Sequence, residues 1–206
     1  MKKLLLAAAI ATISSGAMAA DNGNSYVGVQ LGYANSSSSA QDTANNIVRQ
    51  VGGVVSVSQS SGSALGRAFA GYQFNENIST EIGIYRTSSL KANFAGVTGG
   101  SVAYTGSINA YAWGGDASIL LRPSVSTGLN GLFGRVGGHW DSIEYSGCSA
   151  RCASSSESGT GFLAGAGYDA SFDKNLLGRV EYTYYDSLAG GNSSANTGSV
   201  SLMYKF

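Results

Sequence analysis

The sequence has little of what soluble enzymes and helical membrane proteins need. Its 206 residues include one proline and one histidine, and only 12% are charged. So few charged residues cover a fully water-exposed protein surface poorly. After residue 20 no apolar run approaches the roughly 20 residues with which a helix spans a bilayer. Phosphate loops, metal-ligand spacings and paired catalytic carboxylates are also missing. We therefore expect no enzymatic activity, no cofactor and no metal.

The residues that are abundant suit a β-rich protein at a lipid boundary. The chain contains 30 glycines and 12 tyrosines, and glycine weakens helices. A protein that faces lipid on the outside and water on the inside would show this bias. The formal net charge is zero, and without a basic excess the chain is a poor ligand for nucleic acid, so we expect no such partner.

The first twenty residues, MKKLLLAAAIATISSGAMAA, have the pattern of a secretory signal peptide. Lys2 and Lys3 precede an apolar run from Leu4 to Ile13, and small residues follow up to Ala20. This run is about half as long as a membrane-spanning helix. We predict that residues 1–20 direct export and that residues 21–206 form one domain.

Alternation with a period of two residues predicts about eight strands in the exported chain. In the first, Val29 and Leu31 fall on one face, whereas Gln30 and Gly32 fall on the other. Each later strand likewise has an apolar face and a face of glycine, small polar or charged residues. The predicted strands are Ser25–Ala34, Ser63–Phe74, Ile78–Arg86, Gly106–Leu121, Gly131–Trp140, Gly161–Phe172, Leu176–Asp186 and the last segment up to Phe206.

A secreted β-sandwich would show the same alternation, but the connections between strands favour a barrel. Tight turns at Asn75–Asn77 and Asp173–Asn175 alternate with long segments at Asn35–Gly62, Thr87–Thr105 and Asp141–Thr160. Short turns on one side and long loops on the other are typical of outer-membrane barrels. The fold class predicted is all-β: an eight-stranded antiparallel up-and-down transmembrane β-barrel in the outer membrane of a Gram-negative bacterium.

Several stretches give the chain a family resemblance. AFAGYQFNENISTEIGIY (residues 68–85), GRVGGHW (134–140), GRVEYTYYD (178–186) and the final MYKF resemble the small eight-stranded outer-membrane barrels, that is, the OmpA transmembrane domain and its OmpX-like relatives. The resemblance implies that Leu202, Tyr204 and Phe206 are the signal read by the barrel-assembly machinery. Unlike OmpA, the chain ends at the barrel, so we do not expect attachment to peptidoglycan.

The charges on the inward faces are expected to pair, because buried charges in a narrow barrel need partners. Counted from the turns, Glu81 and Arg179 lie at one height, whereas Arg135, Glu181 and Asp116 lie at another. The resemblance implies the same pairs, Glu81 with Arg179 and Arg135 with Glu181. It also implies that one further family pair is missing, because the chain has Gly167 and Ser118 where the family has an acidic residue and a lysine.

Cys148 and Cys152 are separated by three residues in an exported chain, and we predict a disulfide between them. The only histidine, His139, lies near Asp141 and Ser142, but this spacing alone does not make a catalytic triad. A polar residue at the barrel mouth is the simpler reading of His139.

The long loops predict a structural and surface-interaction role resembling adhesion. The expected partners are outer-membrane lipid, the assembly machinery and host or cell-surface ligands. The alternative function is a narrow, gated, porin-like channel through the lumen.

Overall fold

The computed structural model describes residues 25–36, 54–59, 62–97, 103–123, 131–148, 152–191 and 193–206. The predicted signal peptide lies outside these residues. The strands are β1 (Ser25–Ser36), β2 (Val54–Gln59), β3 (Gly62–Gln73), β4 (Ile78–Thr87), β5 (Leu90–Val97), β6 (Ala103–Leu121), β7 (Leu132–Cys148), β8 (Cys152–Ser171), β9 (Leu176–Leu188) and β10 (Ser193–Lys205). No helix among the described residues has the length and hydropathy needed to cross a bilayer.

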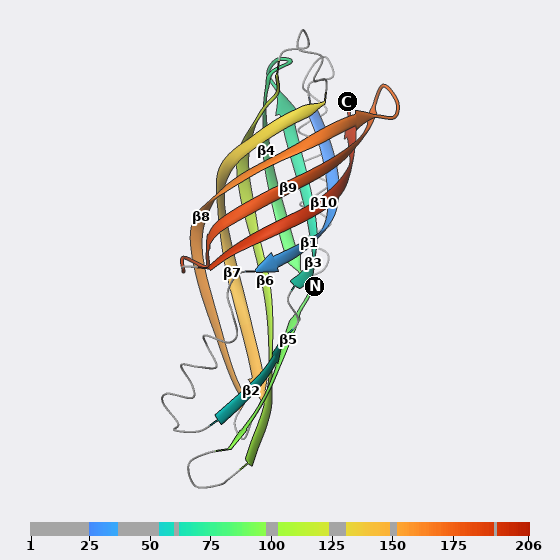
Figure 1. The fold of residues 1–206 in the computed structure, drawn as a ribbon. Helices are drawn as coiled ribbons and strands as arrows, with labels where there is room; N and C mark the ends of the chain where they lie inside the picture. Colours follow the sequence, from blue (N-terminus) through green and yellow to red (C-terminus); the bar gives the residue numbers. More distant parts are fainter. Residues whose placement is uncertain are drawn as a thin grey trace, which may run out of the picture.

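Eight of these strands form a closed antiparallel barrel, which confirms the predicted fold (Figure 1). Around the barrel the order is β6, β4, β3, β1, β10, β9, β8 and β7, and pairing of β6 with β7 closes the ring. The last strand pairs with the first, with Val27 opposite Tyr204 and Tyr33 opposite Gly198. Closure leaves no unpaired strand edge inside the hydrocarbon region, where an unpaired backbone group would be costly.

One side of the barrel continues as a sheet beyond the rim, which corrects the prediction of long loops there. β6, β7 and β8 have 19, 17 and 20 residues, whereas β1 and β3 have 12 each. β5 follows β4 along the same edge of β6, and β2 pairs with β5. In Figure 1 this part projects from the end opposite the C-terminus. We call it the extension: β2, β5, and the parts of β6, β7 and β8 at residues 103–112, 141–148 and 152–160.

The prediction of a long loop is wrong for parts of all three segments: β2 lies in Asn35–Gly62, β5 lies in Thr87–Thr105, and the Ser-rich and Gly-rich segment Asp141–Thr160 belongs largely to β7 and β8. In the structure β7 and β8 remain paired from Leu132 opposite Tyr168 to Cys148 opposite Cys152. The ladder of backbone hydrogen bonds outweighs the low strand propensity of serine and glycine, because that propensity depends strongly on context.

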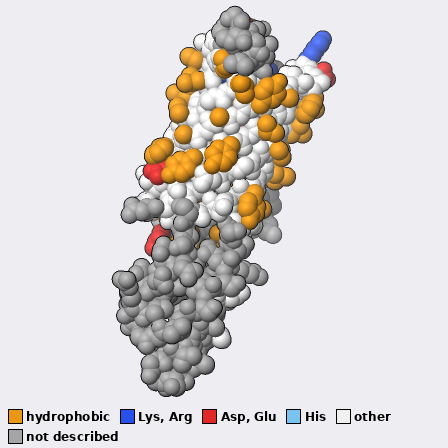
Figure 2. All heavy atoms as spheres, in the orientation of Figure 1, with side chains coloured by type: hydrophobic (Ala, Val, Ile, Leu, Met, Phe, Trp, Pro, Cys, Tyr) orange, Lys and Arg blue, Asp and Glu red, His pale blue; other side chains and the backbone are white. Residues whose placement is uncertain are grey.

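The outward face of the barrel is apolar all round. Val29, Leu31 and Ile82 have exposed fractions of 61%, 70% and 60%, which would be unfavourable in water but suits contact with lipid. Figure 2 shows hydrophobic side chains spread over the barrel part of the molecule. Aromatic residues mark both ends of this band, Tyr72, Phe74, Tyr168, Phe172 and Tyr204 near the turns and Tyr33, Trp113, Trp140 and Phe162 near the extension. Such girdles mark the two membrane interfaces.

The lumen is filled by two apolar clusters with a charged layer between them. The cluster nearer the turns contains Tyr26, Phe69 and Met203, with Leu177 packed against it. The cluster nearer the extension contains Leu65, Tyr85, Leu163, Tyr185 and Ala195, with Leu188 packed against it. An eight-stranded barrel has an interior just wide enough to be filled by side chains.

Candidate functional site: the charged layer and the barrel rim

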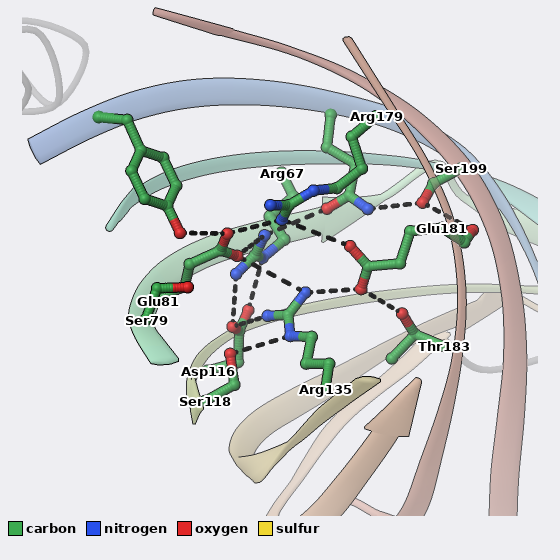
Figure 3. Close-up of polar contacts among 12 residues, drawn as sticks. Arg67, Ser79, Glu81, Asp116, Ser118, Arg135, Arg179, Glu181, Thr183 and Ser199 are labelled. Atoms are coloured by element: carbon green, nitrogen blue, oxygen red, sulfur yellow. Dashed lines mark hydrogen bonds and ion pairs between the residues drawn. The ribbon is translucent and has the colours of Figure 1, made fainter. Parts of the chain in front are cut away.

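Asp116 on β6 joins two arginines from different strands at the centre of the lumen (Figure 3). Arg67 of β3 binds it with both Nε and Nη2, at 2.8 and 2.6 Å. Arg135 of β7 donates to the same carboxylate at 2.6 Å and donates from Nε to Ser118 at 2.9 Å. Paired, charge-assisted bonds of this kind are among the strongest hydrogen bonds in proteins.

Glu81 on β4 is the second junction. Its Oε1 accepts hydrogen bonds from Arg179 Nη1 at 2.6 Å and from the Tyr26 hydroxyl at 2.9 Å. Its Oε2 lies 3.5 Å from Arg67 and 3.9 Å from Arg135. Glu81 therefore faces three arginines that come from three other strands.

Glu181 and Asp169 complete the layer. Glu181 accepts a hydrogen bond from Arg135 at 2.8 Å and one from Thr183 at 2.7 Å. Asp169, nearer the turns, lies 2.6 Å from Arg179 Nε and 2.8 Å from Arg122 Nη2. Together these contacts link the carboxylates of Glu81, Asp116, Asp169 and Glu181 to the guanidinium groups of Arg67, Arg122, Arg135 and Arg179.

The charges of these eight groups cancel, and the central ones are out of contact with water. Arg67, Arg135, Glu81 and Asp116 have side chains that are 0% exposed. Buried charges are tolerated when all are paired and hydrogen-bonded, and removal of one partner is strongly destabilising. The layer therefore holds the strands together across the barrel and fills its cross-section.

Aromatic rings and a glycine fit the arginines into the available space. Arg67 lies over the ring of Phe69 at 4.6 Å, and Arg179 lies over the ring of Phe133 at 4.5 Å, distances typical of cation–π contacts. A Cβ atom on Gly83 would lie 2.6 Å from Arg67 Nε. Glycine at this position leaves the space that the guanidinium group occupies.

The structure brings together all five charges expected to pair. However, Asp116 does not lie at the height of Arg135, although the count from the turns predicts that it does. In the β6–β7 ladder Asp116 lies opposite His139, and Leu120 lies opposite Arg135. Arg135 reaches Asp116 because its side chain extends along the strand.

Three members of the layer, Arg67, Asp169 and Arg122, are not among the charges that the sequence pattern predicts to pair. A signal for Asp169 was available, since counting from the tight turn at residues 173–175 sets it opposite Arg179. No local signal links Arg67 to Asp116, because β4 lies between their strands.

The two positions at which a family pair was expected to be missing have other uses. A Cβ atom on Gly167 would lie 2.5 Å from the ring of Phe133, so the ring occupies the space there. Ser118 is the acceptor for Arg135 Nε. Both positions therefore support the arginines that remain.

A polar cluster lies on the outer face where the extension begins. Arg86 lies 4.7 Å from the ring centre of Tyr111, whose hydroxyl donates to Glu144. Trp113 donates to the same carboxylate at 3.2 Å. The bond to Glu144 raises the pKa of Tyr111, so the phenol remains a donor at neutral pH. Trp113 and Trp140 stack edge to face at 5.6 Å just below this cluster.

The predicted cysteine pair lies at the tip of the extension, and the predicted assembly signal lies on β10. The backbones of Cys148 and Cys152 are directly opposite each other at the tip of the extension, but their side chains are outside the described part, and the disulfide stays a prediction. Leu202 and Tyr204 point outward on β10, half-exposed.

The inward-facing residues His139 and Asp141 are separated from Ser142. His139 and Asp141 are buried, whereas Ser142 accepts a hydrogen bond from Ser158 on the outer face. These three residues therefore do not form a triad. The described residues also contain no group of three or more His, Cys, Asp or Glu that could hold a metal ion.

The family model described as the outer membrane protein beta-barrel domain matches residues 5–206. The chain belongs to this family. The protein accordingly lies in the outer membrane of a Gram-negative bacterium, with its apolar outer face in contact with lipid.

Comparison with solved structures gives matches of low sequence identity. Ail of Yersinia pestis, solved in complex with the heparin analogue sucrose octasulfate, is 17% identical, with 89% of this chain and 99% of Ail covered and a TM-score of 0.47. Neisserial surface protein A is 15% identical, with 88% and 97% covered and a TM-score of 0.46. OprG of Pseudomonas aeruginosa is 12% identical, with 89% and 96% covered and a TM-score of 0.45. A comparison with curated protein sequences gives no match.

Proposed function

We propose that the protein is a closed, rigid outer-membrane barrel that presents its extension to the exterior as a surface for binding host or other cell-surface ligands. The observation that carries this proposal is the asymmetry of the strands. A transmembrane strand needs about 9 to 11 residues, yet β6, β7 and β8 have 19, 17 and 20. The excess residues all lie beyond the same rim.

The surface chemistry of the extension supports an interaction role. Serine, asparagine and threonine occupy many outward positions there, among them Ser142, Ser158 and Thr160. Small hydroxyl groups are adaptable hydrogen-bond partners, and a paired sheet loses less entropy on binding than a free loop would.

The test is to shorten the extension in register. Residues 145–155 are replaced by Asn-Gly, a favoured two-residue hairpin turn, so that Glu144 still pairs with Ser156. A second variant replaces residues 91–109 in the same way and joins Leu90 to Ala110. Binding of bacteria that display each variant to cultured cells and extracellular matrix should fall. Each variant should still migrate faster on unheated than on heated gels, as we expect of a folded outer-membrane barrel. Unchanged binding by both folded variants contradicts the proposal.

The second candidate is a narrow channel gated by exchange among the ion pairs. Glu81 favours it, because it bonds to Arg179 and lies within 3.9 Å of two further arginines that could take over its charge. Conductance of planar bilayers separates the two candidates. The filled lumen should pass little current, and Glu81→Ala should raise it or make it unstable. Absence of current in both proteins argues against the channel.

We also propose that Leu202, Tyr204 and Phe206 are recognised by the barrel-assembly machinery. Alternate apolar positions on β10 are available to another protein before β10 pairs with β1 and closes the barrel. Phe206→Ala should lower the amount of folded barrel in cells but leave refolding of the purified chain in detergent unchanged. An equal loss in both assays would indicate a structural role.

A further inference from the structure

At the end of the lumen nearer the extension, the turn between β9 and β10 lies over the apolar cluster described above. Leu188 of this turn packs against the cluster of Leu65, Tyr85, Leu163, Tyr185 and Ala195. The turn closes on itself through hydrogen bonds from Gly190 to Ser187 and from Gly191 to Leu188, at 2.9 and 3.0 Å. The chain's one histidine, His139, contacts β9 at Asp186, directly before this turn.

Two side chains of β7 reach across β8 to hold this turn. The carboxylate of Asp141 accepts the amide hydrogen of Ala189, at 3.1 and 3.2 Å from its two oxygens. Nε2 of His139 lies 2.8 Å from the carbonyl oxygen of Asp186. Both side chains are buried, with exposed fractions of 2% and 3%.

Two glycines of β8 make the crossing possible. Gly159 lies opposite Asp141, and Gly161 lies opposite His139. A Cβ atom on Gly159 would lie 1.9 Å from Gly190 N, and one on Gly161 would lie 2.0 Å from Asp186 O and 2.6 Å from His139 Nε2. Any larger residue would push the turn away from the lumen.

Two residues of the turn other than glycine have a left-handed backbone conformation. Ser187 and Ala189 have φ values of 54° and 52°, in the left-handed region that residues other than glycine seldom occupy without support from their surroundings. The contacts from His139 and Asp141 provide that support, so their loss should release the turn.

The geometry around His139 favours its doubly protonated form. Nε2 faces the Asp186 carbonyl oxygen, and Nδ1 faces the Asp141 carboxylate at 3.6 Å. Nε2 is within hydrogen-bond distance of its acceptor, whereas Nδ1 makes no hydrogen bond within the described residues and meets the carboxylate only as a charge pair. A second proton on the ring therefore gives the buried Asp141 carboxylate a counter-charge that a neutral ring does not supply.

The other charged and titratable groups near His139 have their own partners or are neutral. Asp116 of β6 is bound by Arg67 and Arg135. The Asp186 carboxylate of β9 accepts from Ser187. The ring of Tyr185 lies 5.4 Å from the imidazole, and Tyr85 of β4 has a buried hydroxyl that, among the described residues, has no hydrogen-bond partner.

We propose that the turn Ser187–Gly191 is a pH-controlled lid over the lumen mouth, held by His139 and Asp141 and released when His139 loses its second proton. Because the folded lid favours the imidazolium, its stabilising effect is present in full below about pH 6.5, where histidine ordinarily changes charge. The effect is lost as the pH rises above that value. Release would expose the apolar cluster nearer the extension to the exterior. The charged layer would still close the barrel on the other side of that cluster.

Nuclear magnetic resonance of the full-length barrel in nanodiscs tests the lid directly. Because the chain has one histidine, the imidazole nitrogen signals are unambiguous. Protection of the Ala189 amide from hydrogen exchange, corrected for the intrinsic effect of pH, should be at least about tenfold greater at pH 5.5 than at pH 8, because the buried carboxylate that accepts this amide loses its counter-charge when His139 is neutral.

Three variants keep the test decisive. His139→Gln and Asp141→Asn should show low protection of Ala189 at both pH values, and the Ser142→Ala control should behave as the parent does. Migration on unheated gels verifies that each barrel is folded. Equal protection at both pH values in the parent, or an unchanged pH dependence in His139→Gln, overturns the proposal.

Discussion

Glu81 and Arg179 lie 98 residues apart in the chain and 2.6 Å apart in the lumen. The bond joins β4 to β9, two strands that are not neighbours in the barrel. Backbone hydrogen bonds hold each strand only to its two neighbours, so connection of opposite walls depends on interior side chains such as those of the charged layer.

Removal of Glu81 should destabilise the barrel far more than removal of an exposed carboxylate. Glu81→Ala leaves Arg179 and Arg67 short of a buried partner, and we expect a loss of about 3 to 5 kcal/mol in the free energy of unfolding. The matched control is Glu144→Ala on the outer face of the extension, where the expected loss is below about 1 kcal/mol. Urea titration of both variants in lipid vesicles measures the difference. Similar losses in the two variants would contradict a buried role for Glu81.

A methyl group added to the inner wall at Gly83 should disturb the charged layer. The new Cβ atom of Gly83→Ala would meet the Arg67 guanidinium at 2.6 to 2.9 Å. Because that group is fixed by Asp116, it cannot move aside freely, and we expect a loss of about 1 to 3 kcal/mol. Gly66→Ala is the control, since nothing lies within 4 Å of the added atom. Equal stability of the two variants would contradict the prediction, because it would show that the Arg67 guanidinium group can move aside without loss.

The two tryptophans should report one membrane depth. Trp113 and Trp140 are the only tryptophans in the chain and their rings stack at 5.6 Å. At the extracellular girdle, lipids brominated near the headgroup should quench their fluorescence more strongly than lipids brominated near the bilayer centre. Stronger quenching by lipids brominated near the bilayer centre would contradict the placement of these tryptophans at the membrane boundary.

The cysteines should be joined in protein isolated from the outer membrane. Cys148 and Cys152 are opposite each other in the β7–β8 ladder, and directly opposed residues have Cβ atoms about 4.5 to 5.5 Å apart, so a small adjustment brings them to bonding distance. The closed loop is short, so reduction should change barrel stability by less than the roughly 3 kcal/mol given for a 15-residue loop. Mass spectrometry after alkylation without reductant measures the state of the thiols. Two alkylated cysteines would rule the disulfide out.

The local properties of the protein follow from its amino-acid sequence alone. The alternation of Val29, Gln30 and Leu31 already assigned each residue to the lipid or the lumen, because successive side chains of a strand point to opposite faces. The tight turn at residues 173–175 determined the register of β8 against β9, which sets Asp169 opposite Arg179.

Which groups meet across the barrel, and how far the strands extend, depends on how the whole sheet closes. Arg67 contacts Asp116 past an intervening strand, and His139 reaches the β9–β10 turn over Gly161. Such contacts depend on the tilt and closure of the whole sheet, which no local pattern records. The sequence pattern does not predict the strands of the extension for a related reason. The strand state of Ser-rich and Gly-rich segments such as residues 152–160 comes from backbone bonds to a partner strand, and these bonds do not depend on side-chain identity.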